Sequence, residues 1–275
     1  MGRLSPRIAA VLLFCAFLAL GSATGFAQDK ASVTVKDLNE QTVMALSWME
    51  ASAEYRELCY QAYNLADMIV DKALAAPSDK PLAIIADLDE TLIDNSAYDA
   101  GLVGTSSSYA GKTWTMWENA AMARGMPGAS DFLNDVKGKH VEVFYVTNRD
   151  QAGLAGTIKN LQALGFPFAD AKHVLVSTGS SDKQPRFDQV AKDYNVAVYM
   201  GDNANDLPIG TYHKSMADRN SLVDQNKAMF GTKFVALPNP TYGDWEGALA
   251  PGYFGLTPEK KDQARKSVLQ TWTAP

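Results

Sequence analysis

Cysteine is almost absent from this chain, which has only two among its 275 residues. Cys15 lies in an apolar segment near the amino terminus, and Cys59 is the only other thiol. Once that segment is removed, no intrachain disulfide can form, even in a compartment that permits one. A disulfide-stapled scaffold is therefore excluded, and we expect Cys59 to be a small buried hydrophobic side chain.

Positive charge and long apolar runs are also scarce. The 25 Lys and Arg residues are outnumbered by 31 Asp and Glu, which gives a net charge of −6. No overall basic field is present to hold a nucleic acid duplex or an anionic membrane. The apolar run at 8–20 has thirteen residues, too few to cross a hydrocarbon core of about 30 Å. We expect neither a nucleic acid duplex as a partner nor a stable membrane anchor.

Two familiar hydrolase signatures are missing as well. The chain has three histidines, which are isolated from one another, and none stands in an Arg-His-Gly context, so a phosphohistidine mechanism is disfavoured. No Gly-x-Ser-x-Gly occurs, which excludes a serine-hydrolase nucleophile elbow.

The run at 8–20 is typical of an export signal. Arg3 and Arg7 precede it, and small residues follow it as far as Ala27. We predict a signal peptide over 1–27, cleaved after Ala27, and hence a periplasmic or secreted protein. Cleavage would take the formal charge from −6 to −8, because both arginines leave.

The remaining residues, 28–275, are predicted to form a single domain. Cys15 lies inside the apolar run, whereas lipid attachment requires a Cys at its end after small residues, so a lipid anchor is not expected.

Short apolar runs in the domain predict buried strands. They lie at 82–86, 141–146, 174–176, 196–200 and 234–237. Helical patterns separate several of them, for example 154–164, so we predict an α/β fold with a parallel sheet and right-handed crossovers. Before the sheet, about 38–75 has amphipathic helical spacing and predicts one or two helices. More than fifty residues separate the first two strands, which predicts a cap built from about 97–130 over the carboxyl edge of the sheet.

Carboxylates follow two of the predicted strands. Asp87 and Asp89 come directly after the first, and Asp202 and Asp206 come after the fourth. Ligands bind at the carboxyl edge of such sheets. Converging carboxylates repel one another unless a cation lies among them, and oxygen ligands suit Mg²⁺. We therefore predict a metal site here.

This arrangement favours phosphoryl transfer. Asp87 can act as a nucleophile that needs no base to activate it, and Asp89 can act as the general acid and then as the general base. Thr147 and Asn148, after the second strand, are candidates to hold phosphate oxygens. Lys183, after the third strand, offers a cation for the transferring group.

At these residues the chain resembles the haloacid-dehalogenase-like phosphohydrolases. The matching motifs are 87–91, Thr147, Lys183 and 201–206. Within that superfamily the chain is similar to the bacterial class C acid phosphatases, related to the outer-membrane lipoprotein acid phosphatase and 5′-nucleotidase group. The closer likeness rests on 39–41 with 53–55, on 89–98, on Lys183 with Arg186, and on 237–246 (Leu-Pro-Asn-Pro-Thr-Tyr-Gly-Asp-Trp-Glu).

The resemblance implies a Rossmann-like core with a smaller helical cap, here about 31–76 and 97–130. It implies hydrolysis of phosphomonoesters, including nucleoside monophosphates, through an aspartyl phosphate, often by a homodimer. It also implies Mg²⁺ held by the Asp87 carboxylate, the Asp89 carbonyl and the Asp202 carboxylate. Asp206 would bind a metal-bound water or orient Lys183.

Other expectations from the resemblance concern surrounding residues. Arg186 would support the residues that bind phosphate without contacting the phosphate itself. Tyr98, Trp114 and Tyr242 are candidates to stack on a nucleoside, and the alternative for each is an ordinary cap or core aromatic. The fourth motif departs from the usual pattern, with Ala204 and Leu207 in place of the more usual Leu and Phe, which predicts altered packing with the carboxylates retained.

Two alternatives remain open. A binding protein could keep the fold and hold a nucleotide or other ligand with little or no turnover, although the presence of Asp89 favours an enzyme. A sugar-phosphate phosphatase or phosphotransferase could use the same core, because water and a sugar hydroxyl compete for the same aspartyl phosphate.

Overall fold

Five parallel strands form the central sheet, in the spatial order β5-β4-β1-β6-β7. The structure, a computed structural model, describes residues 32–274, so the predicted signal peptide, its cleavage site and Cys15 lie outside the described residues. The strands are β1 (Leu82–Ala86), β4 (Glu142–Val146), β5 (Val174–Leu175), β6 (Asn195–Gly201) and β7 (Phe234–Ala236). Each lies within two residues of a predicted strand, and the predicted parallel α/β fold is confirmed.

Helices cover both faces of the sheet, which is why its central strand is buried throughout. Ile84 of β1 faces one layer, made by α3 (Ala53–Leu74), α6 (Ala129–Gly138) and α7 (Leu154–Ala163). Ile85 points the opposite way, as the two-residue period of a strand requires, toward Phe187 and Val190 of α8 (Gln184–Asp193). The two cores fix β1 and therefore the position of the residues that follow it.

The amino-terminal helical region contains more helices than the one or two predicted. It comprises α1 (Val35–Glu40), α2 (Val43–Ala51) and α3. Ser52 separates the last two, because its backbone is extended and its hydroxyl accepts a hydrogen bond from the Tyr55 amide at 3.1 Å. The buried stripe of α3 includes Cys59, which is fully buried as predicted, and burial raises the pKa of its thiol to about 11.

The segment between β1 and β4 folds as short elements at the carboxyl edge of the sheet. They are β2 (Ile93–Asp94), α4 (Ser96–Ala100), α5 (Gly111–Ala120) and β3 (Arg124–Gly125), with β2 and β3 paired antiparallel. Helix α5 packs on α7, and α4 packs on α2. The segment that we predicted to be a cap therefore contacts both the core and the amino-terminal helices.

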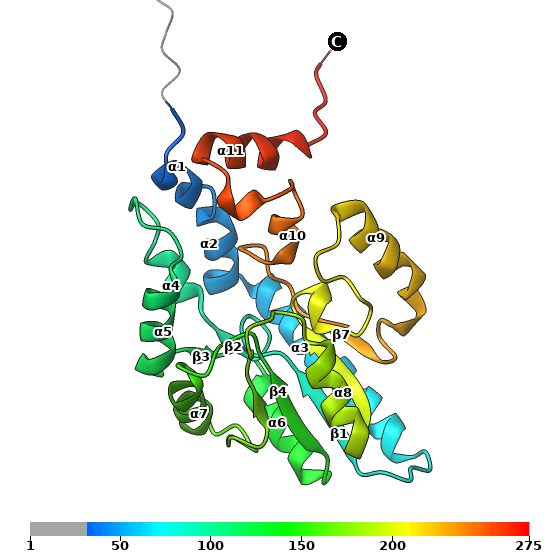
Figure 1. Cartoon of the computed structure of the whole chain (residues 1–275). Helices are drawn as coiled ribbons and strands as arrows, with labels where there is room; N and C mark the ends of the chain where they lie inside the picture. Colours follow the sequence, from blue (N-terminus) through cyan, green and yellow to red (C-terminus); the bar gives the residue numbers. More distant parts are fainter. Residues whose placement is uncertain (1–31, 275) are drawn as a thin grey trace, which may run out of the picture. The chain divides into compact units, whose positions relative to one another are not determined.

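The carboxyl-terminal part completes the described chain. Its helices are α9 (Met216–Gln225), α10 (Asp244–Gly247) and α11 (Pro258–Ser267), with 3-10 turns at Ala204–Asp206, Lys227–Met229 and Tyr253–Gly255. Helix α11 lies against α1, so the first and last helices of the described chain are neighbours (Figure 1). Across residues 32–274, no helix is both long enough and apolar enough to span a membrane.

Candidate active site

The first pair of acidic residues lies on a tight loop that continues β1. The Asp87 amide donates to the Met200 carbonyl at 2.9 Å, so Asp87 still follows the strand path. The chain then turns, and the Leu88 carbonyl accepts from the amides of Leu92 (2.8 Å) and Ile93 (2.9 Å). Glu90 adopts a left-handed backbone with φ of 57° in this turn. The turn leaves Asp87 and Asp89 at the carboxyl edge of the sheet.

The second pair follows β6. Gly201 ends that strand, and the 3-10 turn Ala204–Asp206 folds Asp206 back toward it. The turn is fixed by the Asn203 amide, which donates to Asp206 Oδ2 at 2.8 Å. A Cβ atom at Gly201 would overlap the Asp206 side chain. The glycine is therefore required for this close approach.

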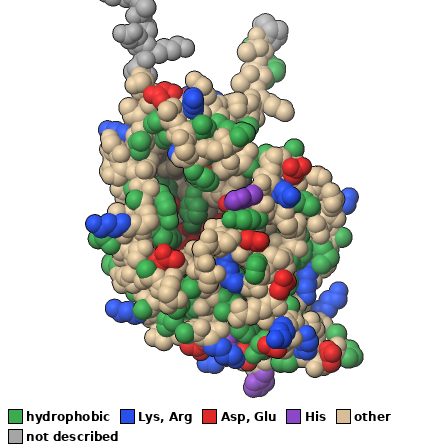
Figure 2. Space-filling view, viewed as in Figure 1, with side chains coloured by type: hydrophobic (Ala, Val, Ile, Leu, Met, Phe, Trp, Pro, Cys, Tyr) green, Lys and Arg blue, Asp and Glu red, His purple; other side chains and the backbone are tan. Residues whose placement is uncertain are grey.

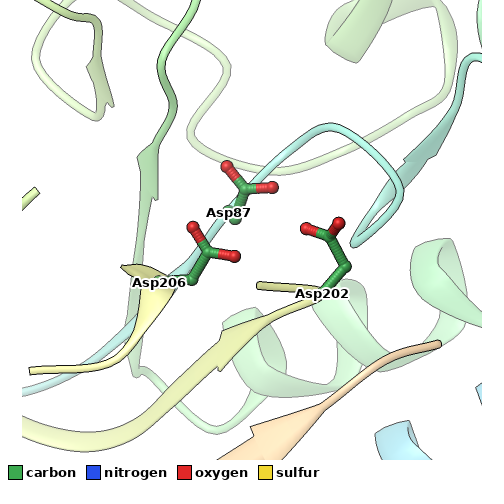
Figure 3. Close-up of side chains that lie close together, drawn as sticks. All are labelled: Asp87, Asp202 and Asp206. Carbon is green, nitrogen blue, oxygen red and sulfur yellow. The ribbon is translucent and has the colours of Figure 1, made fainter. Parts of the chain in front are cut away.

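The structure brings three carboxylates together. One oxygen each from Asp87, Asp202 and Asp206 lies within 4.8 Å of the others (Figure 3). The buried Lys183 ammonium pairs with Asp87 and with Asp206, the latter at 2.7 Å. Asp202 has no cationic partner among the described residues. Its neighbours are the hydroxyl of Thr91, 3.3 Å from its Oδ1, and the amide of Asn239, which donates to its Oδ2 at 2.9 Å.

Burial dominates the electrostatics of this cluster. It raises the pKa of Asp87 to about 7, an effect that Lys183 opposes and that Asp206 and Asp89 reinforce. Burial, then Asp206 and Asp87, hold the pKa of Asp202 well above its usual range. Burial alone would lower the pKa of Lys183, but Asp206 and Asp87 raise it overall, so Lys183 is charged.

One charged lysine thus faces three carboxylates, of which Asp87 and Asp206 are buried and Asp202 is half-buried. No positive charge among the described residues lies beside Asp202, and the ligand atoms that the three carboxylates offer are all oxygens. The residues therefore fit a divalent metal ion that binds oxygen ligands.

The carboxylate of Asp89 lies apart from the other three. It accepts hydrogen bonds from Arg149, at 3.0 Å from Nε and 2.8 Å from Nη2, and from Asn95 Nδ2 at 2.9 Å. The Thr147 hydroxyl lies 3.4 Å from Asp89 Oδ2 and accepts from the Arg149 amide at 3.1 Å. Asp89 therefore has a defined orientation of its own, and its carboxylate is separate from the carboxylate cluster.

The candidates for phosphate binding occupy different positions. Asn148 and Lys183 line a cavity, whereas Thr147 is fully buried and its hydroxyl faces Asp89. Arg186 donates to the Thr147 carbonyl and, at 2.7 Å, to Asn148 Oδ1. It therefore braces the loop that follows β4, without lining the cavity itself.

The cavity has a volume of about 590 Å³ and opens on the face seen in Figure 2, where hydrophobic side chains border a hollow. Asp87, Asp89 and Asp202 line it, as do two of the predicted stacking residues, Trp114 and Tyr242. Tyr98 does not line it and instead packs edge-on against the Trp114 ring, with 5.0 Å between ring centroids.

Several residues at the site were not predicted. Arg149, Glu90 and Asn239 each contact a functional side chain: Arg149 holds Asp89, Glu90 accepts from the Tyr242 hydroxyl, and Asn239 holds Asp202. The aromatic side chain of Tyr109 also lines the cavity beside Trp114. The sequence did contain a signal for Arg149. It follows the same strand as Thr147, at the carboxyl edge of the sheet, where a charged side chain is expected to pair with a group of opposite charge.

Comparison with known proteins is consistent with this geometry. A family model described as "HAD superfamily, subfamily IIIB (Acid phosphatase)" matches residues 10–245. The chain is similar to the class C acid phosphatase from Bacillus anthracis, at 39% identity and a TM-score of 0.83, over 86% of this chain and 99% of that one. A crystal structure of that enzyme with tungstate bound gives the same identity, coverage and TM-score.

Proposed function

This chain belongs to subfamily IIIB of the HAD superfamily, the acid phosphatases, and is a phosphatase; from that premise we propose its metal, substrates and catalytic route. The proposal is Mg²⁺-dependent hydrolysis of phosphomonoesters, including nucleoside monophosphates, with transfer of the phosphoryl group first to Asp87. The observation that carries it is the cluster of Asp87, Asp202 and Asp206 around Lys183 at the floor of a cavity.

The metal would be held by the Asp87 and Asp202 carboxylates and the Asp89 carbonyl. Oxygen atoms are the ligands that Mg²⁺ prefers. When bound, the ion offsets the negative charge of the carboxylates and of the phosphoryl oxygens. Asp206 pairs with Lys183 at 2.7 Å, so its part is to hold this ammonium beside Asp87.

Asp87 and Asp89 have different roles in the two half-reactions. An Asp87 oxygen attacks phosphorus, the ester P–O bond breaks, and protonated Asp89 gives its proton to the departing alkoxide oxygen. In the second half, water attacks phosphorus, Asp89 takes a proton from that water, and the bond to Asp87 breaks. The product is inorganic phosphate, and both aspartates return to their starting states.

The cavity supports a leaving group larger than phosphate. Its volume of about 590 Å³ lies in the usual range of small-molecule sites. Trp114 and Tyr242 line it, and stacking on such aromatic rings would suit a nucleobase without strong base preference. Tyr98 would support the Trp114 ring from its edge. The tungstate bound by the similar phosphatase is a tetrahedral oxyanion, as phosphate is, which supports an anion site here.

The proposal is tested with Asp87→Asn, which keeps the shape of the side chain and removes the nucleophile. We expect no turnover of a chromogenic phosphomonoester and an unchanged circular dichroism spectrum. The wild type should lose activity on chelation and regain it with Mg²⁺, on a panel that includes nucleotides and sugar phosphates. Turnover by Asp87→Asn, or activity indifferent to a strong chelator, would contradict the proposal.

We further propose export, on the strength of the amino-terminal pattern alone. Amino-terminal sequencing of the exported protein should begin at Gln28. A retained segment 1–27 or an acylated Cys15 would contradict this part.

A further inference from the structure

Arg149 is almost entirely buried, with 2% exposure, and all three nitrogens of its guanidinium donate hydrogen bonds. Besides its bonds to Asp89, it donates from Nη1 to the Thr157 hydroxyl at 3.0 Å and from Nη2 to Asn95 Oδ1 at 3.2 Å. Arg149 Nε and Nη2 both donate to Asp89 Oδ1, and Nε also lies 3.3 Å from Oδ2, so the guanidinium restricts both the position and the rotation of this carboxylate. The orientation of the Asp89 carboxylate therefore depends on where Arg149 lies.

Helix α5 contacts the same guanidinium twice. Trp114 and Glu118 are four residues apart, so they share one face of the helix. The guanidinium carbon lies 5.6 Å from the centroid of the Trp114 ring, and Glu118 Oε1 lies 3.9 Å from Arg149 Nε. The cap segment thus supplies both an aromatic face and a carboxylate to the residue that holds Asp89.

Glu118 is unusual because it is buried without hydrogen bonds. Its exposure is 2%, and neither of its carboxylate oxygens has a hydrogen-bond partner of good geometry within residues 32–274, although the Trp114 side chain lies close enough to lower its pKa slightly. A buried polar group of this kind is rare and calls for an explanation. Burial raises the pKa of Glu118 to about 7, with Arg149 opposing and Asp89 and Asp150 adding to the shift.

Glu118 is closely packed against the start of α7. A Cβ atom at Gly153 would overlap its carboxylate, and a Cβ atom at Gly156 would overlap the α5 backbone. Two glycines at the start of α7 thus allow α5 to approach and keep the carboxylate against Arg149. Glu118 does not line the cavity, so contact with a substrate does not explain it.

We propose that helix α5 positions the general acid through Arg149: Trp114 and Glu118 hold the guanidinium, and the guanidinium orients the Asp89 carboxyl toward the leaving group. Arg149 and Glu118 are positioning residues in this scheme. The inference rests on the proposed role of Asp89. Trp114 also lines the cavity, so the same residue would contact a bound leaving group and the guanidinium that orients Asp89.

The proposal makes a prediction that depends on the leaving group. An alkoxide leaving group needs the proton from Asp89, whereas a dinitrophenolate is a stable anion and departs without one. A misplaced Asp89 should therefore reduce kcat/KM for an alkyl phosphate and leave dinitrophenyl phosphate nearly unaffected. A general loss of folding or of metal would lower both alike.

The test compares kcat/KM for the two substrates in Arg149→Lys and Glu118→Leu. Lysine keeps a charge but loses the fork, and leucine removes both carboxylate oxygens in either protonation state. We expect Arg149→Lys to lower kcat/KM for the alkyl phosphate on the order of tenfold more than for dinitrophenyl phosphate, because misplacing the acid removes only part of the 10²- to 10⁴-fold contribution of general acid catalysis. Glu118→Leu should show the same selectivity with a smaller loss.

Asn119→Leu is the matched control. Asn119 is exposed on the same helix and donates to the Ala152 carbonyl at 3.2 Å, so this variant loses a cap contact without touching Arg149. It should change both substrates equally. Equal losses on both substrates in Arg149→Lys, or in Glu118→Leu if the first does not fold, would overturn the inference.

Asp89→Asn separates this inference from the proposed function. If Asp89→Asn is selective against the alkyl phosphate and the other two variants are not, only the positioning role fails. If Asp89→Asn itself shows no selectivity, the assignment of Asp89 as the acid fails, and the inference fails with it.

Discussion

Replacing Lys183 with Met should destabilise the protein strongly, because it removes the one cation between buried carboxylates. Lys183 is 2% exposed and pairs with Asp87 and Asp206, which are 6% and 5% exposed. Methionine fills a similar volume, so packing is largely retained. Breaking a buried pair by removing one partner costs about 3–5 kcal/mol. For a domain of this size, that corresponds to a decrease in Tm of roughly 6–20 °C.

The stability lost in Lys183→Met should increase with pH. The folded-state pKa of Asp87 is raised to about 7, so ionisation of this group costs more in the folded than in the unfolded protein. This contribution favours the folded state at low pH and is lost as the pH rises from the unfolded value, about 4, through the folded one. Without Lys183 the folded pKa rises further, so the deficit of the variant should be small in acid and largest above neutral pH.

Lys139 provides the matched control. Its ammonium contacts three carboxylates, Asp67 at 2.5 Å and Asp71 and Asp135 at 2.7 Å each, but two of these side chains are more than half exposed. Solvent screens such pairs, so Lys139→Met should cost only about 0–1 kcal/mol. Thermal unfolding of both variants, with chelator present and at several pH values, makes the comparison. Equal losses in the two variants would refute the electrostatic reasoning.

Three further predictions concern separate parts of the fold. Asp202→Asn should weaken Mg²⁺ binding by at least about tenfold, because it removes a ligand charge; calorimetric titration of wild type and variant measures this, and unchanged affinity would place the metal elsewhere. Tyr242→Phe deprives the buried Glu90 carboxylate of a hydrogen bond and should cost about 1–3 kcal/mol in urea unfolding; a variant as stable as the wild type would show that this bond contributes nothing. The Cys59 thiol, fully buried with its pKa raised to about 11, should resist alkylation near neutral pH until the protein unfolds; rapid labelling of the native protein would contradict its burial.

The strands could be predicted because their signal is local. An apolar run such as 82–86 predicts a buried strand from its own residues alone. Because the carboxyl ends of parallel strands lie at one edge of the sheet, Asp87 is then expected near Asp202 without any tertiary information. The cluster of Asp87, Asp202 and Asp206 follows from that placement. The motifs that follow the strands were therefore enough to predict that the carboxylates and Lys183 lie at the site.

What could not be predicted depends on contacts between distant segments. Glu118 lies in a helix whose sequence gives no sign that Arg149, 31 positions later, packs against it. The Tyr242 hydroxyl meets Glu90 only because the loop after β7 returns to the turn after β1. Similarly, the split between α2 and α3 follows from a single cap at Ser52, a weaker signal than the amphipathic spacing on either side of it.

In the proposed mechanism, Asp87 carries the phosphoryl group during turnover. The direct measurement is an acid quench of the working enzyme with a phosphomonoester labelled at phosphorus, followed by protease digestion and mass mapping of the peptides. We expect label on the peptide that contains Asp87, present in the wild type and absent from Asp87→Asn. Label on a histidine or on Asp89, or turnover with no labelled peptide at any quench time, would contradict it.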